Sequence, residues 1–240
     1  DDVVSARLFS DLAVEMTEAG LEVTAMPSIR SCHGDATAYP KREQWSGGRV
    51  LRVWRPAWRQ SSNKGRLGNA IAILLAWTWR AAWFPRKPNE TMIVGTDPIL
   101  AVLVTIAWRI LRPKARIIHW CHDLYPHAAI ADGLLSPRSW FLSPLNCLLR
   151  IAYRRCDVIA DLGACMRREL LQASQVAEVS SSNLSGVRLV TLTPWALHEP
   201  NEVSQADASV RSELFGDAQL GLLYSGNLGR AHEFDLFLQL

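Results

Sequence analysis

Several features that define common protein classes are missing from this sequence of 240 residues. Its five cysteines are odd in number and include no C-x-x-C pair, which argues against a disulfide framework or a zinc cluster and favours a reducing compartment. No signal peptide opens the chain, because Asp1 and Asp2 precede an amphipathic helical pattern and not an apolar segment. The most apolar run, residues 70–84, is interrupted by Arg80 and is too short to span a bilayer.

Familiar catalytic patterns are also missing. The sequence contains no Ser/His/Asp order, no H-E-x-x-H, no P-loop lysine and no cluster of metal ligands. We therefore expect neither a resident metal nor an obligatory cofactor. An apolar content of 49% and a charged content of 20% do indicate a globular fold, with one large or two modest domains.

Positive charge is concentrated in one part of the chain. Residues 41–90 hold eleven Lys or Arg and two Glu, a net charge of +9, whereas the whole chain carries only +3. Six of the ten tryptophans lie in the same region, and Trp interleaved with Lys and Arg is typical of a membrane interface. A core helix with snorkelling arginines explains residues 70–84 equally well, and no known nucleic-acid motif accompanies the charge. The candidate membrane-docking residues are Trp54, Trp58, Trp77, Arg80, Trp83, Arg86 and Lys87.

Strand and helix patterns alternate along most of the chain. Helices are expected over residues 5–19, 69–84, 99–111, 145–155 and 164–173, and strands over 21–26, 49–54, 91–94, 117–120, 157–160, 187–193 and 220–224. Residues 28–48 are expected to form a long loop. This alternation predicts a doubly wound α/β domain with a parallel sheet, followed by the first β-turn-α of a second such domain.

The loop that follows the strand at Ile117 carries the most suggestive chemistry. His122 and Asp123 come directly after this strand, and ligands of open parallel sheets gather beyond the carboxyl ends of the strands. His119, still on the strand, is expected to pack in the core. A polar loop with a capping Asp123 remains the alternative interpretation.

Two further turns join a strand to a helix. Gly95-Thr96-Asp97 precedes Pro98, which fits the first turn of a helix with Thr96 or Asp97 as its N-cap. The turn Ser225-Gly-Asn-Leu-Gly229 would let backbone N–H groups approach a phosphate at a helix N-terminus. Its spacing lacks the first glycine of the dinucleotide-binding fingerprint, and glycines are also needed in ordinary tight turns. The candidate phosphate-binding residues are Gly226, Asn227, Gly229 and Arg230.

Taken in order, these segments resemble a bacterial glycosyltransferase of the GT-B type, in the retaining family 4 that builds O-antigen, capsule or exopolysaccharide. The opening helix and Gly20-Leu-Glu-Val23 are similar to the start of that family, and His122-Asp-Leu-Tyr-Pro126 resembles its "D-L-W-P" loop. Pro194-Trp195 stands where the family has "P-N", and Leu223-Tyr-Ser-Gly-Asn-Leu-Gly229 resembles the opening of its nucleotide-binding domain.

The resemblance implies two Rossmann-like domains that face each other across a cleft. Residues 1–197 would be the acceptor-side domain, 198–217 a linker, and 218–240 the start of the nucleotide-sugar-binding domain. The donor would be a UDP- or GDP-type sugar whose diphosphate lies near Gly226, Asn227, Gly229 and Arg230. His122 and Asp123 would face the cleft, with Gly95, Thr96 and Asp97 in an acceptor-side loop.

The same resemblance implies a hexosyl- or N-acetylhexosaminyltransferase that acts on a polyprenyl-diphosphate-linked or similar glycan at the inner face of the cell membrane. We expect no nucleic-acid partner. Val3-Val4 stands where the family has glycine, and its donor-binding glutamates would fall beyond Leu240, so residues 1–240 by themselves are expected to be inactive. A nucleotide-sugar 2-epimerase on the same scaffold and a non-catalytic membrane-surface module are the alternatives.

Overall fold

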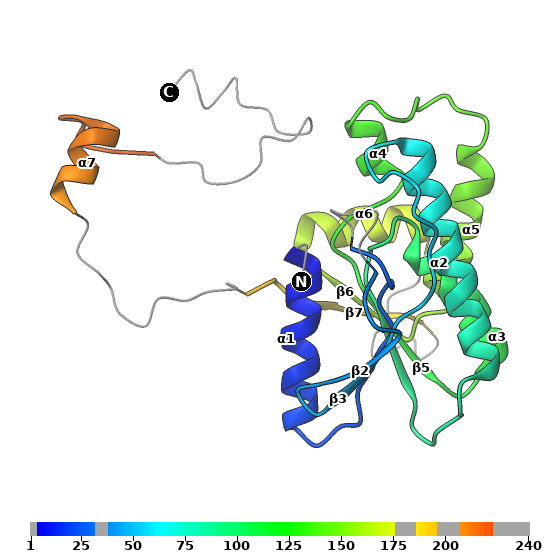
Figure 1. The fold of residues 1–240 in the computed structure, drawn as a ribbon. Helices are drawn as coiled ribbons and strands as arrows, with labels where there is room; N and C mark the ends of the chain where they lie inside the picture. Colours follow the sequence, from blue (N-terminus) through cyan, green and yellow to red (C-terminus); the bar gives the residue numbers. More distant parts are fainter. Residues whose placement is uncertain (1–3, 32–37, 176–185, 196–206, 223–240) are drawn as a thin grey trace. The chain divides into compact units, whose positions relative to one another are not determined.

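The computed structural model describes residues 4–31, 38–175, 186–195 and 207–222. The chain divides into two compact units, Asp1–Trp195 and Ala196–Leu240. Figure 1 shows the order of the elements along the chain. In the described part of the second unit lies one helix, α7 (Ala208–Phe215), which occupies part of the segment expected to be a linker. Of the strand expected over 220–224, residues 220–222 are described and are not in a strand.

The first unit is built around a parallel sheet of four strands. These strands are β4 (Thr91–Val94), β5 (Arg116–Trp120), β6 (Val158–Asp161) and β7 (Arg188–Thr191), in the spatial order β4-β5-β6-β7. All four residues of β6 are buried, as expected for an inner strand of a parallel sheet covered on both faces. The predicted α/β architecture with a parallel sheet is confirmed.

A second, mixed sheet corrects part of that prediction. Strands β1 (Thr24–Ala25) and β3 (Gly48–Leu51) pair in parallel, and β2 (Arg42–Trp45) pairs antiparallel with β3. The loop expected over residues 28–48 therefore contains a strand. All four residues of β2 are exposed, so its sequence lacks the apolar alternation that marks a half-buried strand. Ser46 and Gly47 connect β2 to β3 with positive φ angles of 45° and 77°, as in a tight hairpin turn.

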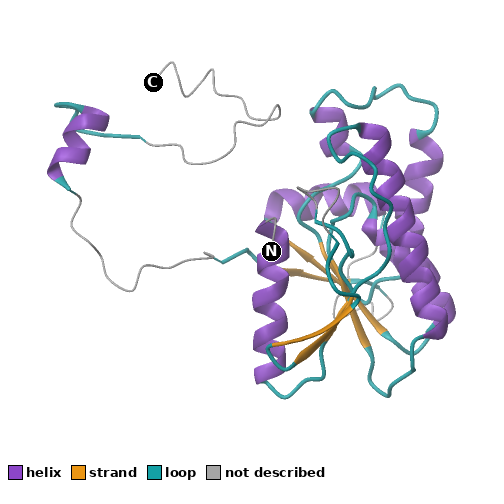
Figure 2. Cartoon of the chain, in the orientation of Figure 1, coloured by secondary structure: helices purple, strands orange, loops and turns teal. Residues whose placement is uncertain are grey.

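Helices cover the sheets on both sides (Figure 2). They are α1 (Val4–Glu18), α2 (Asn63–Trp83), the 3-10 helix η1 (Ala101–Leu103), α3 (Val104–Leu111), α4 (His127–Ala131), α5 (Leu142–Arg154) and α6 (Ala164–Ser174). Helices α2, α3 and α5 pack side by side, and α1 lies across the sheets from them (Figure 1). Helix α2 begins six residues earlier than predicted because the Ser62 side chain accepts a hydrogen bond of 3.0 Å from the Gly65 N–H.

The core lies between the four-stranded sheet and the helices. Ile117 of β5 and Ile159 of β6 are almost fully buried, and Leu149, Ala152 and Tyr153 of α5 pack into the same cluster. Burial of this contiguous apolar surface is the main driving force for folding of the first unit.

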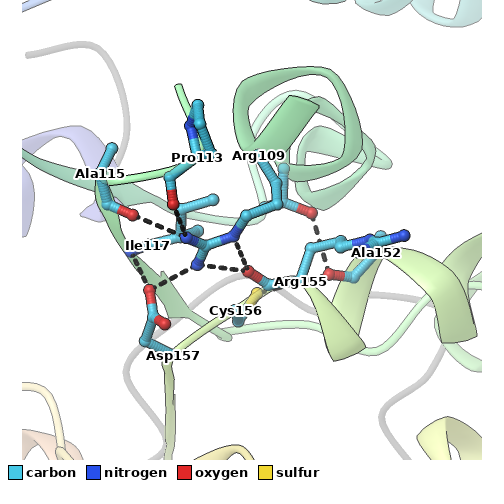
Figure 3. Close-up of polar contacts among 9 residues, drawn as sticks. Arg109, Pro113, Ala115, Ile117, Ala152, Arg155, Cys156 and Asp157 are labelled. Atoms are coloured by element: carbon cyan, nitrogen blue, oxygen red, sulfur yellow. Dashed lines mark hydrogen bonds and ion pairs between the residues drawn. The ribbon is translucent and has the colours of Figure 1, made fainter. Parts of the chain in front are cut away.

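A polar network ties the core together at the amino ends of β5 and β6 (Figure 3). The Arg109 guanidinium donates to the carbonyls of Pro113, Ala115 and Arg155 and forms an ion pair of 2.6 Å with Asp157. The same carboxylate accepts a hydrogen bond of 2.6 Å from the Ile117 N–H. Because this network joins α3 to the start of two neighbouring strands, it fixes the amino ends of these strands. The candidate site lies at the opposite, carboxyl ends.

Candidate functional site

The loops after β4 and β5 come together at the carboxyl edge of the parallel sheet. Val94 at the end of β4 pairs with His119 of β5, so the turn at Gly95 and the loop at His122 leave the sheet side by side. The Asp97 charge acts on both His122 and Asp123, which places these three side chains in one electrostatic neighbourhood. The structure thus brings the two predicted acceptor-side segments together.

A cluster of aromatic rings packs against His122. Trp120, almost fully buried at the end of β5, lies with its ring centroid 4.5 Å from that of His122 and 5.2 Å from that of Phe9 on α1. Trp195 stacks on Trp120 at 5.6 Å and donates a 3.0 Å hydrogen bond from Nε1 to Asp11 on α1. Rings locked in this way leave His122 little rotational freedom.

His122 is held as a neutral imidazole. Burial against the aromatic rings lowers its pKa, and the carboxylates of Asp123 and Asp97 oppose this shift. Neither ring nitrogen has a hydrogen-bond partner among the described residues. A buried donor or acceptor that lacks a partner costs free energy, so a ligand or water that supplied one would be favoured here.

Asp123 is shifted in the opposite direction. Partial burial raises its pKa, the nearby Asp97 carboxylate adds to the increase, and His122 works against it. A carboxylate with a raised pKa is a better proton acceptor than an ordinary surface Asp. His122 and Asp123 therefore form a neighbouring imidazole and carboxylate with altered proton affinities.

The turn after β4 differs from the prediction. The 3-10 helix begins at Ala101, so Thr96 and Asp97 are not its N-cap, and that expectation is wrong. Asp97 instead accepts a 2.6 Å hydrogen bond from the Ser5 hydroxyl and so connects to the start of α1. The Thr96 hydroxyl is buried without a hydrogen-bond partner in the described part of the chain.

Gly95 allows this close approach of α1. A Cβ atom at Gly95 would lie 2.6 Å from Cε2 of the Phe9 ring, closer than real Cβ contacts occur. The family resemblance implies an acceptor-side loop at Gly95. The packing role of Gly95 depends on Phe9 of α1, some ninety residues earlier in the chain, so the local sequence does not reveal it.

An open hollow of about 430 Å³ lies beside His122 and Asp123. Part of its wall comes from the first turns of α6, a segment that was not among the predicted site residues. Besides His122 and Asp123, its polar and charged lining residues are His127, Cys165, Arg168 and Glu169. The position of α6 in the sequence could have indicated this wall. Helix α6 directly follows β6, so it begins at the carboxyl ends of the strands, where the site lies.

Asp161 at the end of β6 also contributes to the site, although the sequence pattern did not predict it. Its carboxylate is fully buried and accepts hydrogen bonds from the Gly163 N–H at 3.1 Å and from the Thr191 hydroxyl at 2.8 Å. The Arg167 Nε lies 2.7 Å from the other carboxylate oxygen. With its oxygens occupied in this way, Asp161 joins β6, β7 and α6 and positions the wall of the hollow.

The arrangement suits a polar ligand group that carries hydroxyls. Asp123 can accept a proton or a hydroxyl hydrogen bond, His122 can donate or accept one, and Arg168 adds positive charge to the wall. Across the described residues, no group of three or more His, Cys, Asp or Glu side chains is placed to hold a metal ion. The candidate phosphate-binding residues Gly226, Asn227, Gly229 and Arg230 lie outside the described residues.

The predicted membrane-docking tryptophans separate into two groups. Trp54, Trp58 and Trp83 are exposed, as a docking role requires. Trp77 packs against the core, and its indole N–H donates a 2.8 Å hydrogen bond to the Met26 carbonyl, so Trp77 is not available at the surface. In the described parts of the chain, no helix is both long enough and apolar enough to cross a bilayer.

Comparison with known proteins adds no family to this description. No protein-family model matches the chain, and no curated protein shows significant sequence similarity to it.

Proposed function

We propose that this chain provides the acceptor-side domain of a glycosyltransferase that uses a nucleotide-diphosphate sugar. The observation that carries the proposal is that His122 and Asp123 lie next to each other at the carboxyl ends of a parallel sheet and line an open hollow of about 430 Å³. Ligands of open α/β sheets gather at this edge, and a sugar hydroxyl requires a nearby proton acceptor in order to react. The resemblance of residues 122–126 and 223–229 to GT-B enzymes of family 4 supports the same reaction class.

In the proposed reaction, an acceptor hydroxyl forms a bond to the anomeric carbon of the donor sugar. The bond from that carbon to the diphosphate oxygen breaks, and the nucleoside diphosphate leaves with the bonding electron pair. Asp123 accepts a hydrogen bond from the acceptor hydroxyl, and its raised pKa suits it to take up the proton. Gly226, Asn227, Gly229 and Arg230 are proposed to stabilise the leaving diphosphate.

The proposed acceptor is a polyprenyl-diphosphate-linked glycan at the inner face of the cell membrane, and the proposed donor is a UDP- or GDP-type hexose or N-acetylhexosamine. Retention of anomeric configuration follows from the family resemblance. Activity is measured on the native gene product.

Substitution of Asp123 by Asn tests the proposal. It removes the proton acceptor at nearly constant size, so turnover with a prenyl-diphosphate-linked sugar should fall by about 10²-fold or more. Asp132→Asn is the matched control, because it removes a neighbouring carboxylate whose charge also acts on Asp123, and it should change turnover less than about threefold.

The assay records release of nucleoside diphosphate with and without acceptor, together with formation of the glycosylated lipid. Glycosylated product that depends on acceptor supports transfer. Nucleotide release at the same rate without acceptor indicates an epimerase or hydrolase, and equal turnover by the wild type and Asp123→Asn would remove Asp123 from the mechanism.

A further inference from the structure

Helix α2 is apolar on the side that faces away from the protein. Its inner side buries Ala70, Ile73 and Ala81. Five large apolar residues follow one another at intervals of four along the outer side, and all are between 45 and 72% exposed. They are Leu67, Ile71, Leu75, Trp79 and Trp83, and we call them the α2 outer stripe. A surface helix normally presents polar residues on this side.

The outer stripe extends beyond the helix itself. The ring of Trp58 lies directly over Gly68, where a Cβ atom would come within 2.4 Å of ring atom Cζ3. The Trp58 carbonyl accepts a 2.9 Å hydrogen bond from Asn69 Nδ2, which fixes this loop on the helix. At the other end, Trp79 and Trp83 lie 5.6 Å apart between ring centroids. The surface is therefore ordered by packing and is not a set of scattered apolar side chains.

The charged residues of the segment that carries the stripe are all basic. No Asp or Glu occurs between Glu43 and Glu90, and Arg80 is the only charged residue from Leu67 to Trp83. Lysines and arginines flank both ends of the stripe. They are Arg59, Lys64 and Arg66 at the start of α2, and Arg80, Arg86 and Lys87 at its end. Lys87 also forms an ion pair with Glu22, and Arg86 donates to the Leu111 carbonyl.

We propose that the α2 outer stripe is a docking surface for an anionic lipid bilayer, on which α2 lies parallel to the membrane plane. Apolar side chains of the stripe would enter the boundary between headgroups and acyl chains, where the indoles of Trp79 and Trp83 are favourably placed. The flanking cations would attract anionic headgroups.

A second copy of the chain is a poorer occupant of this surface. In a two-fold dimer the same patch meets itself, so the basic ends of one stripe would face the basic ends of the other. Residues 44–89 contain no carboxylate, and in the described part of the chain Glu22 forms an ion pair with only one of these flanking cations, Lys87. A lipid surface supplies the missing negative charge.

The docking surface begins close to the candidate site. Burial raises the pKa of Tyr125 in the His122 loop, and the charge of Arg66 in the first turn of α2 opposes this shift. A bilayer bound along α2 would thus lie near the carboxyl edge of the sheet. The docking proposal does not depend on sugar transfer, because vesicle binding is measured without any nucleotide sugar.

Cosedimentation of the chain with vesicles tests the proposal. We expect binding to phosphatidylcholine vesicles that contain about 30% phosphatidylglycerol, and weaker binding when salt is raised from about 0.1 M to about 0.5 M, because salt screens the cationic flanks. The double substitution Trp79→Gln/Trp83→Gln should lower the partition coefficient at least about tenfold. The control is Trp140→Gln, which removes a tryptophan that is 86% exposed outside the stripe and should change binding less than about twofold.

A second variant separates charge from apolar insertion. Arg59→Gln/Lys64→Gln/Arg66→Gln removes three of the six flanking cations, so it should weaken the preference for anionic over neutral vesicles and reduce the salt dependence. Circular dichroism verifies that each variant retains its helix content. Wild-type binding by folded Trp79→Gln/Trp83→Gln would overturn the proposal, as would an equal loss in Trp140→Gln. Sedimentation velocity without lipid gives a further test, because a dimer abolished by Trp79→Gln/Trp83→Gln would assign the stripe to a second copy.

Discussion

At the scale of single residues, the buried His119 couples folding to pH. Burial lowers its pKa from the ordinary 6.5 to about 4, although the hydrogen bond between Nδ1 and the Val94 carbonyl partly opposes the shift. The unfolded chain therefore binds a proton more readily than the folded chain, and the stabilising effect of neutral His119 is lost as pH falls from 6.5 towards 4. Between pH 7 and pH 5 this loss should reach about 2 kcal/mol.

The measurement is urea unfolding of the wild type and of His119→Asn at both pH values. Asparagine can keep a donor near the Val94 carbonyl but does not titrate, so the variant should lose about 2 kcal/mol less stability than the wild type over this interval. The other acidic and basic groups titrate in both proteins and cancel in the comparison. Parallel pH profiles for the two proteins would contradict the prediction.

The two histidines of this region show how far single residues could be predicted. The position of His119 within an apolar strand correctly predicted a core residue, and the position of His122 after the strand correctly predicted a loop residue. The burial of the His122 ring against Phe9 and the Ser5 partner of Asp97 were not predictable, because both depend on α1, which is distant in sequence.

At the scale of elements, the fit between α1 and the turn after β4 depends on Gly95. In Gly95→Ala the new methyl group would meet the Phe9 ring at 2.6 Å, and that ring cannot move freely because it packs against Trp120 and His122. Overpacking of this kind should lower the free energy of unfolding by about 1–3 kcal/mol.

A double-mutant cycle with Phe9→Leu measures this contact. The smaller Leu should relieve the clash, so Gly95→Ala should cost at least about 1 kcal/mol less in the Phe9→Leu background than in the wild type. Equal costs in both backgrounds, measured by urea unfolding, would show that the turn and α1 are not coupled through Phe9.

Most helices and strands of the first unit were predictable from local sequence patterns, and each exception has an identifiable cause. Helices α1, α5 and α6 lie within a few residues of their predicted ranges because their apolar residues recur at helical spacing. Strand β2 was not predicted because none of its residues is buried, so its sequence shows no apolar alternation. Its extended conformation is instead stabilised by antiparallel pairing with β3. The start of α3 was placed too early because Leu100 adopts a left-handed φ of 64° before the helical turns begin.

At the scale of the whole molecule, the first unit should fold by itself. Every member of its buried core cluster lies between Ala81 and Leu189, within residues 1–195. A chain of residues 1–195 should therefore unfold in one cooperative thermal transition, with a midpoint within about 4 °C of that of residues 1–240. Circular dichroism at 222 nm records both transitions.

The control is a chain that ends at Cys156. It lacks β6, α6 and β7, and with them the core residues Ile159, Leu170 and Leu189, so it should show no cooperative transition. A cooperative transition in this short chain would show that β6, α6 and β7 are not needed for the core. Loss of the transition in residues 1–195 would show that the core also needs residues after Trp195.

The sequence by itself determined the α/β class with a parallel sheet, the order of most elements of the first unit, and the concentration of basic residues and tryptophan between Lys41 and Glu90. These properties depend on local periodicity and composition, which each segment carries independently. Only the tertiary structure decided that the strands form two sheets, that α6 supplies a wall of the hollow, and that Trp77 faces the core while Trp79 joins the outer stripe. The physical reason is that strand pairing and the choice of a buried helix face depend on contacts between distant segments, because an all-round apolar helix such as α2 does not identify its inner side in its own sequence.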